Sequence, residues 1–220
     1  MRPVCEFDHL IIGAHTLEQG AAFIEAILGA QPQAGGRHVA MGTHNRVLKL
    51  GARAYLEVIA IDPAAAAPSR PRWFGLDDAN VRAQLRERPR LLTWAARTQD
   101  IDNAVKQCPI ALGPVHAMER GAYRWRITIP DDGAVICDGL VPALIQWDCA
   151  AHPADKLEDR GYELASLEGQ HSDARAVSAA LAELGLESII GPVKAPNARL
   201  AATIRGARGV CAIVTRNLIP

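Results

Sequence analysis

The sequence predicts an α+β fold built from repeated βαβββ units, with a partial third unit at the C-terminal end. Short β-favouring runs are interrupted by single amphipathic helices, and the same order of elements recurs along the chain. Of the 220 residues, 49% are hydrophobic and 22% are charged, which is the composition of an ordinary globular protein large enough to bury a core. A single such unit cannot bury its sheet face, so the copies are expected to pack together.

The first unit is expected over residues 1–62. Residues 4–13 are apolar and β-favouring and predict a buried strand rather than a signal peptide, because a basic flank before a long apolar run is missing. Thr16 and Gln19 have capping-box spacing and predict the start of a helix, which Gly29 is expected to end. Three β-like runs follow, at residues 37–41, 46–50 and 54–61.

The rest of the chain divides into a connection and two further copies. Residues 63–90 are expected to connect the units, with an Ala- and Pro-rich linker and a short helix. The second unit is expected over residues 91–150, with Asp100 capping its helix. The partial third unit is expected over residues 151–220, with a helix at 172–184. The remaining predicted strands are residues 91–96, 115–118, 123–129, 140–147, 164–167, 189–193, 200–204 and 210–215.

Charge and cysteine content exclude several classes of protein. Lys plus Arg equals Asp plus Glu, 24 against 24, so no global field attracts nucleic acid or an anionic membrane. The five cysteines are scattered and contain no C-x-x-C pair, which argues against a disulfide framework or a zinc knuckle. No apolar run is long enough to span a bilayer. We therefore expect a soluble, cytoplasmic protein.

His9 and Glu57 are the candidate catalytic residues. Strand alternation predicts that His9 shares a face with Phe7 and Ile11, and that Glu57 lies among apolar neighbours in the last strand of the first unit. A carboxylate among apolar side chains is costly unless it has a partner, and a proton-transferring role would explain that cost. The alternatives are a core histidine held by hydrogen bonds and a structural pair between Glu57 and an arginine.

Four further residues are candidates for binding a small-molecule ligand. His38 and Asn45 flank a Gly-Thr turn that could aim them at a pocket, although turn chemistry alone would also explain them. Trp73 lies in the connecting stretch, where it could line a pocket mouth or belong to the core. Arg126 could hold a carboxylate or phosphate if it faces inward, and otherwise lies on a solvated outer face. His116, on a strand of the second unit, is the best spare histidine for a metal.

Several short stretches together resemble the glyoxalase-like domain branch of the vicinal-oxygen-chelate superfamily. The first is the opening strand FDHLII, and the next are G-x-H at Gly36–His38, G-T-x-N at Gly42–Asn45 and Y-L-E at Tyr55–Glu57. Later pieces are Arg72-Trp73, then PALIQWD from Pro142, followed by His152-Pro153. The resemblance covers about two thirds of the chain. It implies that paired βαβββ modules curl into an open barrel-like sheet around a pocket.

The resemblance also implies a set of metal ligands. His9 matches the first-strand position, Glu57 the last-strand position of the same module, and Gln146 the last-strand position of the second module, with His116 as a further candidate. The remaining position falls on Thr93, which is not a normal ligand, and this departure argues against an extradiol dioxygenase. The implied cofactor is a divalent metal, one of Zn, Ni, Mn or Fe.

These observations lead to two hypotheses about function and one about assembly. The first is a glyoxalase-like, divalent-metal-assisted lyase or isomerase that acts on a carbonyl-containing metabolite. The second is a metal-free protein of the same fold that binds or sequesters a small molecule. In addition, an exposed sheet edge in the C-terminal unit could pair with a second copy to form a homodimer.

Overall fold

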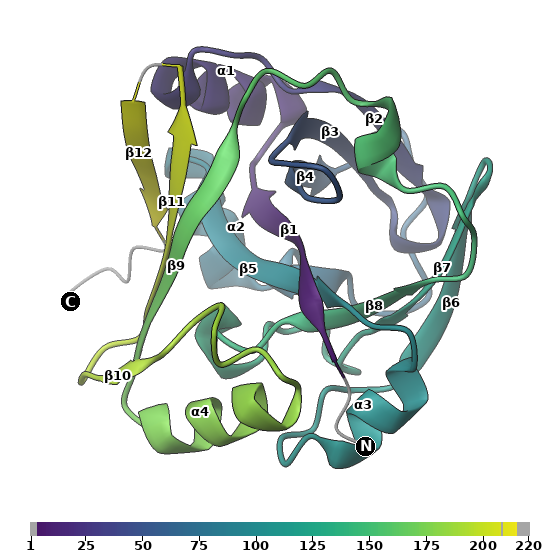
Figure 1. The fold of residues 1–220 in the computed structure, drawn as a ribbon. Coiled ribbons are helices and arrows are strands. Elements are labelled where there is room, and N and C mark those ends of the chain that lie inside the picture. Colours follow the sequence, from purple (N-terminus) through teal and green to yellow (C-terminus); the bar gives the residue numbers. More distant parts are fainter. Residues whose placement is uncertain (1–3, 208, 215–220) are drawn as a thin grey trace.

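The computed structural model describes residues 4–207 and 209–214, which form a mixed α+β fold with two sheets (Figure 1). The outer ends of the first and third predicted units, residues 1–3 and 215–220, lie outside the described residues, and so does the last residue of the strand predicted at 210–215. The order strand, helix, strand, strand, strand occurs three times, as the sequence predicts.

The first module forms one half of the larger sheet. Its elements are β1 (Glu6–Gly13), α1 (Leu17–Leu28), β2 (Gln33–His38), β3 (Thr43–Lys49) and β4 (Tyr55–Ile61), with the 3₁₀ turn η1 (Val39–Met41) between β2 and β3. Thr16 accepts a hydrogen bond from the Gln19 amide and begins α1, and Gly29 ends it with a left-handed φ of 81°. Gly20 lets α1 lie close to the sheet, because a Cβ there would come within 2.3 Å of Val58 Cγ1.

The connecting segment and the second module follow. Their elements are η2 (Trp73–Gly75), α2 (Ala79–Glu87), β5 (Arg90–Arg97), α3 (Ile101–Gln107), β6 (Val115–Arg120), β7 (Tyr123–Thr128), η3 (Cys137–Gly139), β8 (Ala143–Trp147) and η4 (Pro153–Lys156). Asp100 caps α3 by accepting from the Asn103 amide.

Strand order joins the two modules into one barrel-like sheet. The order is β2-β3-β4-β1-β5-β8-β7-β6, with β1 and β5 antiparallel at the centre. Each module places its first strand parallel to its last, so that β1 pairs with β4 and β5 pairs with β8. The two outermost strands, β2 and β6, contact each other, and the sheet therefore curls until it is almost closed. This is the open barrel that the resemblance implies.

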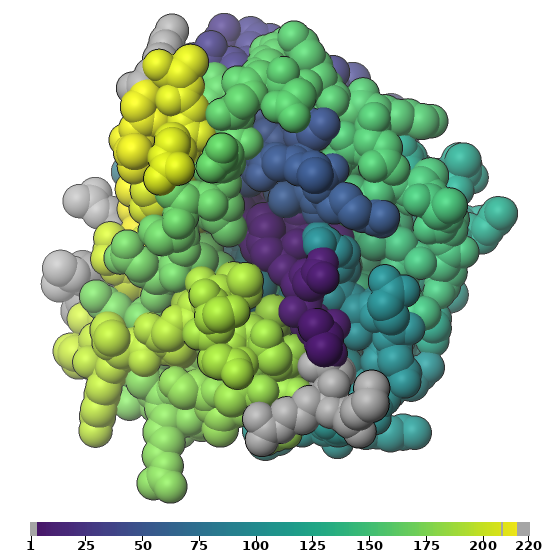
Figure 2. Space-filling model, in the orientation of Figure 1, coloured from purple at the N-terminus to yellow at the C-terminus, as the bar shows by residue number. Residues whose placement is uncertain are grey.

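The third module covers the outside of this sheet. It consists of β9 (Glu163–His171), α4 (Ala174–Glu183), β10 (Val193–Lys194), β11 (Arg199–Gly206) and β12 (Gly209–Val214), and its strands form a second sheet in the order β10-β9-β11-β12. In the space-filling view, the third module (yellow-green to yellow) lies on the left, and the green and teal segments that precede it in the chain lie on the right. β1 (purple) and the β3–β4 turn (blue) are visible between them (Figure 2).

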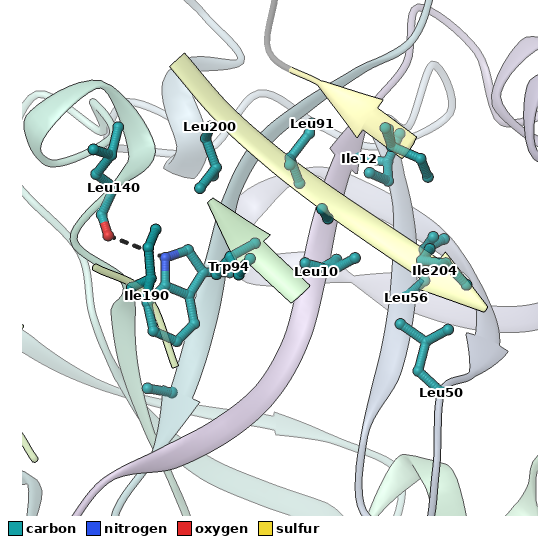
Figure 3. Packing of buried hydrophobic residues seen from close by; sticks show 14 of the residues in the cluster. Leu10, Ile12, Leu50, Leu56, Leu91, Trp94, Leu140, Ile190, Leu200 and Ile204 are labelled. Atoms are coloured by element: carbon teal, nitrogen blue, oxygen red, sulfur yellow. Dashed lines mark hydrogen bonds between the residues drawn. The ribbon is translucent and has the colours of Figure 1, made fainter. Parts of the chain in front are cut away.

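The core between the two sheets uses one face of each strand. Leu200 of β11 lies near Leu91 and Trp94 of β5, and Ile204 lies near Leu56 of β4, with the apolar face of β1 between them (Figure 3). Trp94 is fully buried there and donates from its indole N–H to the Leu140 carbonyl. The opposite face of the larger sheet lines the barrel interior, where a second apolar cluster fills the middle. Within the described parts of the chain, no helix is long and apolar enough to cross a membrane.

Candidate functional site

A small polar cavity lies inside the barrel, at the end where β1 and β4 begin. Its volume is about 30 Å³, room for one or two water molecules. The residues that line it come from both modules and from η2: His9, His38, Asn45, Tyr55, Glu57, Trp73, Phe74, Arg120, Trp125, Ile127, Ile145 and Trp147. The cavity therefore contains His9, Glu57, Asn45, His38 and Trp73, five of the residues singled out from the sequence.

His9 and Glu57 face each other across this cavity. His9 Nε2 lies 3.7 Å from Glu57 Oε2, and both side chains are almost fully buried. Asn45 donates from Nδ2 to Glu57 Oε1 at 2.5 Å, and this bond fixes the carboxylate so that its other oxygen points toward His9. The pairing of three neighbouring strands brings these side chains together. β1 runs parallel to β4 with Ile11 opposite Glu57, and β3 pairs Asn45 with Ile59. The structure thus brings an imidazole and a carboxylate together in a buried site.

Asp8 orients His9 from behind. His9 Nδ1 lies 2.6 Å from Asp8 Oδ1, and the other oxygen of Asp8 accepts from Trp147 Nε1 at 3.0 Å and from His152 Nε2 at 3.1 Å. Burial alone would raise the pKa of Asp8, but the hydrogen bonds from His152 and His9 outweigh it and hold that pKa well below its ordinary value. Because a carboxylate only accepts, His9 carries a proton on Nδ1 and turns Nε2 to the cavity.

A β-bulge allows adjacent residues to reach the same site. Phe7 pairs with Ala96 and His9 with Ala95, so Asp8 is an extra residue in β1 with no partner of its own in β5. This corrects the expectation that Phe7 shares a face with His9: Phe7 packs on the outer core, stacked on Trp94 with ring centroids 6.2 Å apart. Strict alternation would have turned Asp8 away from His9, and the bulge turns it back.

His38 and Arg120 form the opposite side of the cavity. Arg120 donates from Nη1 to His38 Nε2 at 3.0 Å, so His38 must carry its proton on Nδ1, which lies 3.1 Å from Thr43 Oγ1. Burial, aided by the charge of Arg120, lowers the pKa of His38 to about 3. His38 is therefore a neutral hydrogen-bonding residue at physiological pH. The same Arg120 nitrogen also donates to Asn45 Oδ1 at 3.3 Å.

Trp73 and Phe74 cover the cavity. Their rings stack with centroids 5.3 Å apart, and Trp73 meets the edge of His38 at 5.1 Å. Phe74 has a φ of 60°, a left-handed conformation that is rare for an aromatic residue. Among the described residues, Trp73 Nε1 is buried without a hydrogen-bond partner. An indole N–H in that position is satisfied when an acceptor enters.

A larger cavity of about 440 Å³ lies at the other end of the barrel. It is lined by Ala14, Thr16 and their neighbours after β1, by Ile61 at the end of β4, and by Leu76 and Leu85 of the connecting segment. Apolar side chains of the barrel interior, including Ile11 and Ile59, lie between the two ends. The larger cavity offers volume, but its lining contains no buried acid–base pair, so we place the chemistry in the small polar cavity.

Three predicted site residues do not reach the cavity. Gln146 accepts from the Ile101 amide at the start of α3 and so lies outside the barrel, because its neighbours in β8 occupy the inner face. Arg126 also points outward and pairs with Asp102 and Asp148. His116 lies on the edge strand β6, where it contacts Arg70. Alternation on β7 and β8 explains the first two cases, since Trp125, Ile145 and Trp147 point inward.

The strand register also corrects the expected counterpart of the first-strand ligand. His9 pairs with Tyr55 as Ala95 pairs with Ala143, so Ala95, not Thr93, is the second-module counterpart of His9. Two residues further along β8, Ile145 corresponds to Glu57. Thr93 instead donates to the Gly139 carbonyl at 3.0 Å. The second module therefore supplies apolar groups at both positions where the first module supplies polar ones.

The residues present do not fit a divalent metal ion. Metal sites of this kind take three or more protein ligands, but only His9 Nε2 and Glu57 Oε2 are available here, since Glu57 Oε1 is bonded to Asn45. The guanidinium of Arg120 adds a positive charge to the same lining. Within residues 4–207 and 209–214, no three His, Cys, Asp or Glu side chains are grouped so that they could hold a metal.

Three functional side chains were not singled out from the sequence: Asp8, Arg120 and His152. Nothing in the alternation pattern distinguishes Asp8. The Asp-His pair in a buried strand is nevertheless a signal, because two adjacent buried polar residues need hydrogen-bond partners. His152 entered only as one piece of the resemblance. Arg120 carries no local signal, since its role depends on contacts with β2 and β3 that are more than 70 residues away in the chain.

Comparison with known proteins agrees with the fold. The family model of the glyoxalase-like domain matches residues 7–185. A hypothetical protein from Staphylococcus aureus is structurally similar, with 15% identity, a TM-score of 0.59, and coverage of 82% of this chain and 75% of that one. No protein with curated annotation matches the sequence significantly.

Methylmalonyl-CoA epimerases are more distant in structure. The enzyme from Streptomyces coelicolor, in complex with 2-nitronate-propionyl-CoA, shares 19% identity over 68% of this chain and 99% of its own, with a TM-score of 0.44. The enzyme from Mycobacterium tuberculosis shares 17% identity over 66% of this chain and 88% of its own, with a TM-score of 0.42. Overlaps at this level do not bear on the reaction. The family match spans most of the sequence, and the chain therefore belongs to the glyoxalase-like domain family.

Proposed function

We propose that this protein is an enzyme that moves a proton at a carbon next to the carbonyl group of a small molecule, which is lyase or isomerase chemistry. The observation that carries the proposal is the buried pair of His9 and Glu57, 3.7 Å apart in one cavity and each fixed by a hydrogen bond from behind. Two titratable groups held in this way can exchange a proton with a third group placed between them.

In the proposed cycle the pair starts with one proton, carried by His9 Nε2. Glu57 Oε2 takes the proton from the carbon next to the carbonyl, and negative charge develops on the carbonyl oxygen. His9 Nε2 then returns its proton to the substrate, and the proton on Glu57 passes to His9 to restore the starting state. Asp8 stabilises the imidazolium through Nδ1, as the carboxylate of a catalytic triad does.

The carbonyl oxygen needs a donor as its charge develops. Trp73 Nε1 is the group we assign to it, because it is buried beside the cavity and has no partner among the described residues. A substrate of several heavy atoms is larger than the cavity of about 30 Å³, so the cover formed by Trp73 and Phe74 must move when substrate binds. The left-handed backbone of Phe74 is a site where such movement relieves strain.

Deuterium exchange tests the proposal. The protein is incubated in D₂O with 2-hydroxyaldehydes, ketones and 2-oxo amides, and loss of the proton next to the carbonyl is followed by NMR. We expect exchange with the wild type and its loss in Glu57→Gln and His9→Asn, with the exposed Glu18→Gln as the matched control. Exchange that persists in both site variants would place the reaction elsewhere. The same assay with chelator, and with Zn²⁺, Ni²⁺, Mn²⁺ or Fe²⁺ added, tests the metal-assisted form.

The second candidate function is metal-free binding or sequestration of a small molecule. It is favoured by the aromatic lining of the cavity, where Trp73, Trp125 and Trp147 offer flat apolar surfaces. Thermal-shift screening of the same compounds separates the two functions. Compounds that stabilise the protein but undergo no exchange would support sequestration. Stabilisation that is unchanged in His9→Ala and Glu57→Ala would place the binding site outside this cavity.

A further inference from the structure

We infer that Arg120 forms an anion subsite in the polar cavity and that the ligand is a small carbonyl compound bearing a carboxylate, such as a 2-oxo acid. The inference deepens the proposed function and rests on it for the carbonyl part of the ligand. The carboxylate part rests on the environment of Arg120 alone.

The partners of the partly buried arginines differ. Arg70 donates to His116 and to two backbone carbonyls, whereas Arg72, Arg97 and Arg126 each pair with a carboxylate. Arg120, by contrast, donates to the neutral His38 ring and to the Asn45 amide oxygen, and within the described residues it forms no ion pair. A guanidinium in a partly buried, aromatic-lined site is costly without a negative partner. A bound anion would supply that partner.

The fold makes room for this side chain to reach the cavity. Arg120 ends β6 just before the turn at Gly121 and stacks over the Tyr123 ring, with its Cζ 5.7 Å from the ring centroid. From there it crosses the gap between the two outermost strands of the barrel. A Cβ at Gly36 would lie 2.7 Å from Arg120 Cδ, and one at Gly35 would lie 2.0 Å from Asn45 Oδ1. Two glycines in β2 therefore leave the space that this approach requires.

The geometry favours a carboxylate as the anion. Among the described residues, both hydrogen bonds of Arg120 use Nη1, so Nε and Nη2 can offer a carboxylate the parallel N–H donors that match it. Arg120 and Trp73 line the same small cavity as His9 and Glu57, so the carboxylate and the reacting carbonyl must be close together in the ligand. The Glu57 carboxylate does not serve as the partner, because it is bonded to Asn45 and faces His9.

Titration with matched pairs of compounds tests the subsite. Binding of 2-oxo acids and of the corresponding 2-oxo amides is measured by calorimetry on the full chain, for the wild type, Arg120→Gln, Arg120→Lys and the exposed control Arg124→Gln. We expect the wild type to bind each acid at least about tenfold more tightly than its amide, since a hydrogen-bonded charge pair is worth that much. Arg120→Gln should abolish the preference, Arg120→Lys should keep part of it, and Arg124→Gln should not change it.

Several results would overturn the subsite. They are equal affinity for acid and amide in the wild type, a preference that survives Arg120→Gln, failure of every acid to bind, or binding of inorganic phosphate that is tighter than that of any acid. If Arg120→Gln does not fold, as judged by circular dichroism, salt titration of the wild type replaces it, and an acid preference that is insensitive to salt would be contrary to the inference.

The two proposals can fail separately. Preference for acids that depends on Arg120, without proton exchange in D₂O, would remove the enzymatic function and leave the anion subsite. Proton exchange with 2-oxo amides, without any preference for acids, would remove the anion subsite and leave the enzymatic function.

Discussion

The two βαβββ modules present different chemistry to the same cavity. The first lines it with His9 and Glu57. By strand register, the corresponding positions of the second module are Ala95 and Ile145, of which Ile145 lines the cavity. The backbone arrangement is repeated, yet the polar groups are concentrated in one copy and apolar surface in the other. In this duplicated scaffold, one module therefore carries the groups proposed to transfer protons, and the other supplies the apolar side chains that line the cavity opposite them.

The exception to this division is Arg120, which the second module extends to the polar side. It reaches His38 and Asn45 across the gap between β2 and β6 rather than from the inner face of a strand. The positive charge of Arg120 thus comes from the β6–β7 hairpin end of the second module, whereas the inner faces of that module's strands are apolar. The following predictions test whether the modules are as unequal as their linings indicate.

The largest effect is expected from removing the acid–base pair of the first module. Glu57→Gln should lower kcat for proton exchange by about 10²- to 10⁴-fold, the usual contribution of a general base, while the melting temperature changes little. The measurement is exchange in D₂O at saturating substrate, with Glu18→Gln as the control. A loss of less than about threefold would contradict the assignment of chemistry to the first module.

Removing the support behind His9 should chiefly affect stability. Asp8→Ala leaves the donors of His9, Trp147 and His152 without their shared acceptor in a fully buried site, and we expect the free energy of unfolding to fall by about 3 kcal/mol. Urea unfolding measures it, with the exposed Asp131→Ala as the control. A change no larger than that of the control would mean that the network is dispensable.

The neutral state of His38 predicts a pH dependence that belongs to the first module. Its pKa of about 3 lies below the ordinary value near 6.5, so the unfolded chain takes up a proton that the folded protein refuses. The stability is complete above about pH 6.5 and should decrease by about 1.4 kcal/mol per pH unit as the pH falls toward 4. Urea unfolding of the wild type and of His38→Asn at several pH values isolates this slope, with the exposed His15→Asn as the control. Parallel curves for the wild type and His38→Asn would refute it.

The smallest effect is expected at the counterpart position in the second module. Ile145→Val removes one buried methyl group and should cost about 1 kcal/mol of unfolding free energy, with proton exchange within about threefold of the wild type. The same unfolding and exchange measurements apply. A loss of activity comparable to that of Glu57→Gln would show that the second module takes part in the chemistry and would break the comparison between the halves.

Much of this architecture could be predicted from residue order. The helix caps at Thr16 and Asp100, the turn glycines and the alternating strands predict three copies of one unit, and the fold agrees. These features are local, because capping, turn geometry and side-chain alternation depend on residues only a few positions apart. For the same reason, Glu57 could be identified as a buried carboxylate before any coordinates were known.

Other features were decided by contacts between distant segments. A bulge in β1 brings Asp8 beside His9, and the register of β5 and β8 places Ala95 and Ile145 where the resemblance suggested Thr93 and Gln146. The arginine at the cavity is likewise decided by how the barrel closes. A shift of one residue in register moves a side chain to the opposite face. The sequence by itself therefore determined the modules and the polar strands of the first one, and only the tertiary structure decided which side chains meet in the cavity, because register and closure are settled by packing across the whole sheet.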